Sequence, residues 1–379
     1  MSAAYVLLED GARWDGEACG APGPVTGEVV FNTAMSGYQE SMTDPSYAGQ
    51  ILTFTYPHIG NYGVSAEAME SDRVHARAAI MRAAGNGEDA PGAEGAWLDW
   101  LEACGVPGIT GVDTRALVRH IRQGGAMRGG VFPGDMDEAE ARARVAAEPP
   151  MDGRDLACEV TPREPIVLPG DGPRIAMLDT GVKDSIVRHL RARGAHVTLH
   201  PCTAPAEDLL GADAVFLANG PGDPAALSHV VDTVRAVVGR KPVYGICLGH
   251  QLLCRAVGLE TYKLPFGHRG ANHPVKDLAA QRVEITSQNH GFAVLGPGGE
   301  HRLETDEPVR WDTDVGAAEL THVNLYDRTV EGLVLRDVVG GTLQYHPEAG
   351  PGPHDALPFF DRLMAAIAAG ESQVSPEHA

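Results

Sequence analysis

The stretch Gly245-Ile246-Cys247-Leu248-Gly249-His250-Gln251 places one cysteine between two glycines, directly after the apolar pair Val243-Tyr244. This pattern predicts a strand that ends in a sharp turn and continues as a helix, with Cys247 at the apex. Small residues on both sides let such a turn close, and the apex residue must adopt a strained, exposed conformation. At the start of a helix, the positive end of the helix dipole favours the thiolate. The stretch therefore predicts a cysteine nucleophile.

A second stretch, His346-Pro347-Glu348, follows about a hundred residues later. A cysteine nucleophile needs a base and a carboxylate that orients this base, and His346 and Glu348 can supply both. Each stretch alone has a simpler explanation, since a lone apolar cysteine is commonly a core residue. The sequence His-Pro-Glu can likewise be explained by a strand that ends in a turn. Together they favour covalent catalysis, because a core strand has no use for glycines on both sides of a thiol.

The composition limits the partners and the compartment. The chain has 379 residues, enough for two or three domains, and a formal net charge of −21. An acidic chain does not suit nucleic acid or an anionic membrane as its main partner, since both require a basic face. The six cysteines show no Cys-x-x-Cys pair and the histidines no His-Glu-x-x-His spacing, so we expect no bound metal. The N-terminus has no signal-peptide pattern, and a cytoplasmic location is expected.

Two changes in composition divide the chain into an N-terminal domain (1–150), a linker (151–172) and a C-terminal domain (173–379). Short alternating apolar segments separated by turn residues predict a strand-rich, mixed α+β fold for the N-terminal domain. Helical periodicity is expected there at 96–103, 114–123 and 136–147.

In the C-terminal domain, strand and helix patterns alternate. The expected strands are 174–178, 195–200, 214–217 and 243–246, and the expected helices are 182–193, 223–238 and 248–257. This alternation predicts an α/β fold with a doubly wound, mostly parallel sheet, whose catalytic residues lie at the carboxyl ends of the strands. Cys247 follows such an end.

With these patterns in place, the chain resembles a known family. The cysteine stretch, together with Tyr345-His346-Pro347-Glu348-Ala349, is similar to the class I glutamine amidotransferases, which use a Cys-His-Glu triad. The stretches Gly37-Tyr38-Gln39-Glu40 and Thr43-Asp44-Pro45-Ser46-Tyr47 resemble the N-terminal domain of small subunits of glutamine-dependent carbamoyl-phosphate synthetases. The triad stretches mark only the superfamily, whereas the N-terminal stretches point to this subunit.

The resemblance covers roughly residues 5–368 and implies roles for individual residues. It implies that Cys247 attacks the carboxamide of glutamine to form a glutamyl thioester, that His346 activates the thiol and protonates the leaving ammonia, and that Glu348 orients His346. The backbone amides of Leu248 and Gly222 would form the oxyanion hole. The residues that it implies for glutamine binding are Ser46, Gly220, Gly222, Leu248, Gln251, Asn289, Gly291 and Phe292.

The resemblance also implies a partner. A separate, larger subunit would use the ammonia, bicarbonate and ATP to make carbamoyl phosphate for arginine and pyrimidine biosynthesis. The chain has no Gly-x-x-x-x-Gly-Lys-Ser/Thr loop, so we expect no cofactor in it and place ATP and Mg²⁺ on the partner. The N-terminal domain would then be the docking surface for this subunit, or else a domain that serves packing alone.

Three other functions remain open on the residues alone: a stand-alone γ-glutamyl hydrolase or cysteine peptidase, another class I amidotransferase, and a non-catalytic scaffold. The N-terminal domain counts against the hydrolases, which do not need it. The Asp44-Pro45-Ser46-Tyr47 stretch counts against other amidotransferases. An intact set of Cys247, His346 and Glu348 counts against a scaffold.

Overall fold

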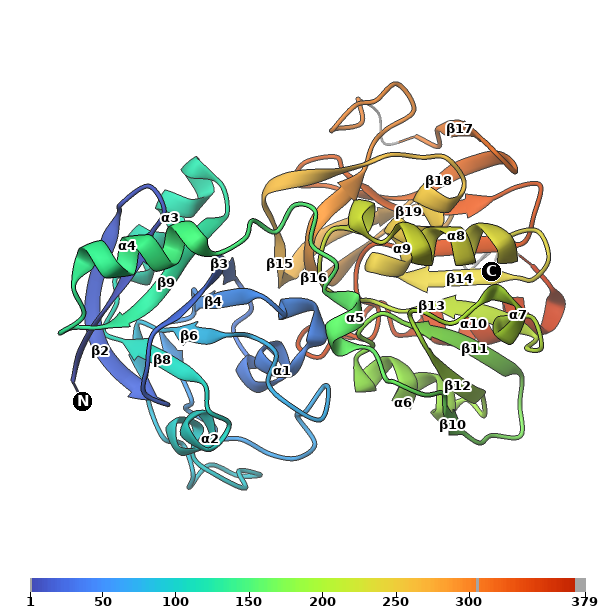
Figure 1. Ribbon diagram of the computed structural model, residues 1–379. Coiled ribbons are helices and arrows are strands. Elements are labelled where there is room, and N and C mark those ends of the chain that lie inside the picture. Colours follow the sequence, from blue (N-terminus) through green and yellow to red (C-terminus); the bar gives the residue numbers. More distant parts are fainter. Residues whose placement is uncertain (1, 305–306, 372–379) are drawn as a thin grey trace. The chain divides into compact units, whose positions relative to one another are not determined.

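A computed structural model describes residues 2–304 and 307–371 of the chain, which divides into two compact units (Figure 1). The first unit comprises Met1–Asp152 and Pro265–Gly270, and the second comprises Gly153–Leu264 and Ala271–Ala379. The expected linker 151–172 contains a short helix and a strand, and this strand pairs with the sheet of the second unit.

The first unit is built on a closed barrel with the strand order β1-β2-β8-β6-β4-β3-β9. These strands are β1 (Ala3–Leu8), β2 (Arg13–Gly20), β3 (Val25–Asn32), β4 (Gln50–Phe54), β6 (Ala78–Ile80), β8 (Pro107–Thr110) and β9 (Met127–Pro133). Two further short strands, β5 (His58–Ile59) and β7 (Ala83–Ala84), pair with each other. Closure satisfies the backbone groups that an open sheet would leave at its edges. The expected strand-rich fold of this part is confirmed.

The helices of the first unit are α1 (Tyr38–Thr43), the 3₁₀ helix η1 (Pro45–Tyr47), α2 (Trp97–Ala103), α3 (Thr114–Gly124) and α4 (Glu138–Ala147). Three of them, η1, α3 and α4, begin where an aspartate side chain caps the helix. The Asp113 carboxylate accepts a hydrogen bond from the Ala116 amide at 3.0 Å, and Asp137 accepts one from Ala139 at 2.9 Å. Such caps satisfy amides that have no acceptor within the helix. The three helices expected from periodicity are confirmed to within two residues at each end.

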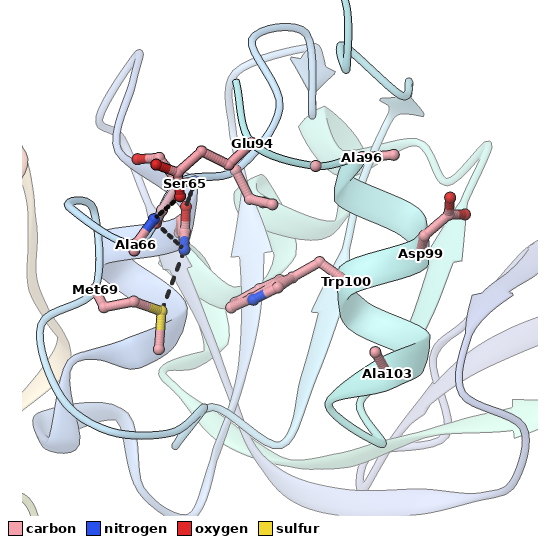
Figure 2. Close-up of a pocket in the computed structure, with 11 residues that line it drawn as sticks. Ser65, Ala66, Met69, Glu94, Ala96, Asp99, Trp100 and Ala103 are labelled. Carbon is pink, nitrogen blue, oxygen red and sulfur yellow. Dashed lines mark hydrogen bonds between the residues drawn. The ribbon is translucent and has the colours of Figure 1, made fainter. Parts of the chain in front are cut away.

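A pocket of about 480 Å³ lies in the first unit (Figure 2). Figure 2 shows Trp100 on α2 facing the segment that carries Ser65 and Ala66. The polar groups of this pocket hold that segment in place: the Glu94 carboxylate accepts from the Ala66 amide at 2.7 Å, and the Gln39 side chain donates to the Ser65 carbonyl at 2.8 Å. They are thus engaged in shaping the loop.

The second unit contains one large mixed sheet with the order β10-β12-β11-β13-β14-β20-β19-β18-β15-β16, and β17 pairs with β18. Its strands are β10 (Ile166–Leu168), β11 (Arg174–Asp179), β12 (His196–Pro201), β13 (Ala214–Leu217), β14 (Val243–Ile246), β15 (Thr261–Asp277), β16 (Arg282–Val294), β17 (Arg310–Thr313), β18 (Gly316–Asn324), β19 (Val330–Leu335) and β20 (Gly340–Leu343). The run β12-β11-β13-β14-β20 is parallel, and it contains the four expected strands. From β20 to β18 and on to β15, the pairing is antiparallel.

Helices cover both faces of the parallel strands, which confirms the doubly wound α/β arrangement. The helices of this unit are α5 (Ala157–Val160), α6 (Asp184–Ala192), α7 (Ala206–Leu209), the 3₁₀ helix η2 (Pro224–Ala226), α8 (Ser228–Val237), α9 (Leu248–Ala256) and α10 (Pro358–Ala369). Along β11, Ala176 and Leu178 belong to the core beneath α8 and α9, whereas Ile175 and Met177 belong to the core beneath α6 and α10. This alternation is the two-residue period of a strand that is buried on both faces.

One expected helix is shorter than its pattern. The helix expected at 223–238 begins only at Ser228, after the 3₁₀ turn η2. The Asp223 carboxylate accepts from the Ala225 amide at 2.8 Å and thereby caps the 3₁₀ turn. Leu227, with φ −91° and ψ 44°, then separates this turn from the α-helix.

Gly249 allows α9 to approach β13 closely, and we expect Gly249→Ala to destabilise the second unit. A Cβ at Gly249 would overlap the carbonyl oxygen of Leu217 on β13, so the helix or the strand would have to move. Overpacking of this kind costs about 2 kcal/mol or more in the free energy of unfolding. Urea denaturation would measure this loss. Gly211→Ala is the matched control, because a Cβ there would meet nothing within 4 Å; an equal effect of both substitutions would contradict the close-approach explanation.

Candidate active site

Cys247 lies between the last residue of β14 and the first residue of α9. Its φ of 55° and ψ of −107° are unusual for a residue with a side chain, which confirms the expected strain at the apex. The expected exposure is wrong, since only 2% of Cys247 is exposed. Strand β16 covers the thiol, and the Asn289 carbonyl lies 3.5 Å from Sγ and accepts its hydrogen bond.

The three residues of the expected triad meet at the carboxyl ends of two neighbouring parallel strands. In the register of β14 and β20, Ile246 is paired with Leu343, so Cys247 and the stretch leading to His346 leave the sheet side by side. The His346 amide donates to the Ser287 carbonyl at 2.9 Å, which fixes the backbone of this stretch against β16. His346 Nδ1 lies 2.6 Å from Glu348 Oε1, within a short ion pair.

The charges of these buried groups stabilise one another. Burial lowers the pKa of His346, but Glu348 and a thiolate on Cys247 outweigh burial, and the pKa rises to about 10. Burial raises the pKa of Glu348, but the charges of Lys183 and His346 outweigh it and hold this pKa well below its usual range. At neutral pH the site therefore holds an imidazolium beside a carboxylate, next to Cys247.

Lys183 is a fourth member of this charged group, and our sequence analysis missed it. Its Nζ lies 3.0 Å from Glu348 Oε1 and donates a hydrogen bond of 2.5 Å to the Ala349 carbonyl. The side chains of Lys183 and Glu348 are 3% and 0% exposed. The available signal was a lysine in the turn that follows strand β11, at the same edge of the sheet as Cys247.

The expected oxyanion-hole residues lie in two sharp backbone segments. Leu248 is the first residue of α9, so its amide has no acceptor within the helix. Gly222 has a φ of 93°, and a Cβ there would lie 2.7 Å from the Arg154 carbonyl oxygen. A Cβ at Gly220 would overlap the carbonyl of Thr180. Glycine is therefore required on both sides of Pro221 for this turn to form.

The side chains expected to bind glutamine come from α9 and β16. The Gln251 side chain donates to the Phe292 carbonyl at 2.8 Å and to Gln344 Oε1 at 3.0 Å, which links the helix to the strand that carries Asn289, Gly291 and Phe292. Ser46 belongs to the first unit, where its amide donates to the Asp44 carboxylate at 2.9 Å. Its expected part in glutamine binding stays a prediction.

Comparisons with known proteins place the chain in a family. A model described as the carbamoyl-phosphate synthase small chain, CPSase domain, matches residues 6–131, and the class-I glutamine amidotransferase model matches residues 176–366. The carbamoyl phosphate synthase small chain of Chlorobaculum tepidum is 46% identical over 366 residues, which cover 94% of this chain and 95% of that protein. The small chain of Methanopyrus kandleri is 46% identical over 368 residues, 96% of this chain and 98% of that one. The chain belongs to the carbamoyl-phosphate synthase small-chain family.

The family matches account for both units of the structure. The small-chain model lies on the barrel unit, and the amidotransferase model contains Cys247, His346 and Glu348. Across residues 2–304 and 307–371, the structure contains no helix that is both long and apolar enough to span a membrane.

We expect Lys183→Met to destabilise the chain, because it leaves the buried Glu348 carboxylate with only one of its two cationic partners. Removal of one partner of a buried ion pair costs about 3 kcal/mol in the free energy of unfolding. Urea denaturation at pH 7 would measure this loss. Adding Glu348→Gln to Lys183→Met should restore part of the stability, since the double variant no longer buries the carboxylate.

Lys241→Met is a suitable control for the lysine substitution. Among the residues that the structure describes, Lys241 Nζ donates only to the Ala212 carbonyl, at 2.7 Å, so a cost of about 1 kcal/mol is expected for the loss of one hydrogen bond. Equal losses from Lys183→Met and Lys241→Met would contradict the role assigned to the Lys183–Glu348 pair.

His250 is expected to make the chain less stable in acid. It is fully buried, its Nδ1 lies 2.8 Å from Thr342 Oγ1, and burial lowers its pKa to about 3, with a smaller contribution from His322. The folded chain therefore keeps His250 neutral, while the unfolded chain takes up a proton as the pH falls below about 6.5. Between pH 7 and pH 5 this difference removes about 2 kcal/mol of stability.

Urea denaturation of the wild type and of His250→Asn at both pH values would measure this difference. The variant should lose about 2 kcal/mol less than the wild type between pH 7 and pH 5. The same loss in both proteins would show that His250 does not cause the acid sensitivity.

Proposed function

We propose that this chain is the glutaminase subunit of a carbamoyl-phosphate synthase, which hydrolyses glutamine and supplies ammonia to a separate synthetase subunit. The observation that carries this proposal is the strained, buried Cys247 beside the His346–Glu348 ion pair, within a chain of the small-chain family. The match over residues 6–131 favours this function both over a stand-alone hydrolase and over other class I amidotransferases.

In the proposed reaction, the Cys247 thiolate attacks the carboxamide carbon of glutamine and forms a tetrahedral intermediate. The backbone amides of Leu248 and Gly222 donate to the oxyanion, and each such donor contributes about 3 kcal/mol in comparable acyl-transfer sites. The C–N bond then breaks, the protonated His346 gives its proton to the leaving amine, and ammonia departs from a glutamyl thioester.

Water completes the cycle. The neutral His346 takes a proton from a water molecule, the resulting hydroxide attacks the thioester carbon, and glutamate leaves as the thiolate and imidazolium are restored. Glu348 holds the His346 ring with Nδ1 toward the carboxylate, which directs Nε2 toward the reacting atoms. Lys183 in turn holds Glu348, so it acts as a positioning residue.

A larger subunit is the partner in this proposal. It would bind ATP and Mg²⁺, combine ammonia with bicarbonate to form carbamoyl phosphate, and thereby serve arginine and pyrimidine biosynthesis. The barrel unit, which the small-chain model matches, is proposed as its docking surface. The proposed compartment is the cytoplasm, where a reducing environment keeps a catalytic thiol such as Cys247 free.

The test compares two nitrogen sources in the complex reconstituted with the large subunit of the same organism. Cys247→Ser should abolish carbamoyl phosphate synthesis from glutamine, because the thiolate is needed to release ammonia. Synthesis from added ammonium should persist, because the later steps belong to the partner. Cys104→Ser, at an exposed cysteine of the first unit, is the control and should retain both activities. Retention of the glutamine-dependent activity by Cys247→Ser would refute the proposal.

A further inference from the structure

Two cysteines and a histidine from three distant segments meet in the second unit, outside the triad. Cys158 lies on α5, Cys202 directly follows β12, and His229 lies in the first turn of α8. Cys158 Sγ is 3.3 Å from Cys202 Sγ and 3.8 Å from His229 Nε2. One ligand atom from each residue lies within 4.8 Å of the other two. The catalytic steps proposed above use none of them.

Two of these distances, those from Cys158 to Cys202 and to His229, are close to those around a tetrahedral metal ion. Thiolates at 2.3 Å from zinc lie about 3.8 Å apart at the tetrahedral angle, and a thiolate and an imidazole nitrogen lie about 3.6 Å apart. The observed distances of 3.3 and 3.8 Å differ from these values by about half an ångström or less. A disulfide would require the two sulfurs to approach to about 2.05 Å, which is a larger change.

Asp155 lies close to both Cys158 and His229. Its Oδ2 is 3.9 Å from His229 Nδ1 and 3.4 Å from Cys158 Sγ, and its Oδ1 accepts from the Cys158 amide at 3.3 Å. At 3.9 Å the contact with Nδ1 is too long for a hydrogen bond. A shift of the carboxylate toward Nδ1 would favour the tautomer that leaves Nε2 free to bind a metal, an arrangement that recurs around zinc. Nε2 is the nitrogen that faces Cys158.

We propose that Cys158, Cys202 and His229 bind one thiophilic divalent metal ion of the zinc class, with water at the fourth position and Asp155 orienting His229. The combination of two thiolates and an imidazole is a ligand set that zinc prefers. Cys158 is exposed, which gives the ion a path to the buried Cys202. The expectation of no metal rested on sequence spacing, and spacing does not detect ligands from three separate segments.

This metal site would also fix the turn that carries Gly222. The Asp223 amide donates to the Arg154 carbonyl at 3.0 Å, and the Gly153 amide donates to the Asp223 carboxylate at 2.9 Å. The segment that leads into Cys158 thus holds this turn, and the metal would tie the segment to β12 and α8. This consequence for glutamine hydrolysis rests on the proposed function, whereas metal binding itself does not.

The test uses Co²⁺ as the probe, with the reduced, metal-free full chain. Tetrahedral Co²⁺ with thiolate ligands gives intense visible bands and a sulfur-to-cobalt charge-transfer band. We expect these bands to saturate at one equivalent and to disappear when Zn²⁺ is added. Cys158→Ser and His229→Ala should each weaken Co²⁺ binding at least 100-fold, and Asp155→Asn about 10- to 100-fold. Cys104→Ser and Cys247→Ser should keep the bands, which distinguishes this site from the other thiols.

The absence of cobalt–thiolate bands in the wild type, or their persistence in Cys158→Ser, would overturn the proposal. Rapid formation of a Cys158–Cys202 disulfide in air, with no metal uptake by the reduced protein, would overturn it as well. A change in the glutaminase rate with Zn²⁺ in the wild type, absent in Cys158→Ser, would establish the link to the Gly222 turn. These spectra require no glutamine, so failure of the glutaminase proposal would leave the metal test intact.

Discussion

The buried ion pair between Lys183 and Glu348 is the interaction on which the catalytic geometry depends. Lys183 follows β11 and Glu348 follows β20, and the strands β13 and β14 lie between these two in the sheet. Neighbouring strands lie about 4.8 Å apart, so β11 and β20 are about 14 Å apart. The ion pair joins the segments that follow these two strands and passes across the carboxyl ends of β13 and β14. The Gly220–Asp223 turn and Cys247 leave the sheet at those two ends. One ion pair thus encloses the edge where Cys247 and the amides of Leu248 and Gly222 lie, and it fixes the Glu348 charge that keeps His346 protonated.

Close backbone packing supplies the second constraint. Cys247 adopts a positive φ only because the segments on both sides of it are held: its amide donates to the Leu343 carbonyl at 2.8 Å, and α9 lies against β13 through Gly249. The free-energy cost of the backbone strain at Cys247 is small compared with the free energy that both segments gain by burying their apolar side chains. The result is a thiol at the start of a helix, beside a cation, in a site from which most water is excluded.

Local patterns predicted the parallel strands, the cysteine turn and the His346-Pro347-Glu348 stretch, since each depends on residues that are adjacent in the chain. They did not predict Lys183, because nothing around Gly181-Val182-Lys183 indicates that its ammonium group reaches a carboxylate 165 residues away. Cys158, Cys202 and His229 were missed for the same reason. The predicted start of the helix at residue 223 was five residues too early. Asp223 instead caps η2, and its carboxylate is held there by the Gly153 amide, a contact that the local sequence does not reveal. The burial of Cys247 depends on β16, an antiparallel strand that the strand–helix alternation did not include.

The two ends of the Gly220–Asp223 turn are held by different contacts. The contacts at Asp223 connect this turn with the segment that carries Cys158, one of the three proposed metal ligands. On one side, the Thr180 hydroxyl donates to the carbonyls of Ala218 and Asn219 at 3.1 and 2.9 Å, inside the core. On the other side, Asp223 is held by the segment 153–154, which continues into α5. That segment is anchored in turn by Thr161, whose hydroxyl donates to the Asp179 carbonyl at 2.7 Å and accepts from the Cys202 amide at 2.9 Å. The Asp223 end of the turn therefore depends on α5 for its position. A metal ion bound by residues of α5, α8 and the segment after β12 would, by fixing α5, also fix the position of the Gly222 amide.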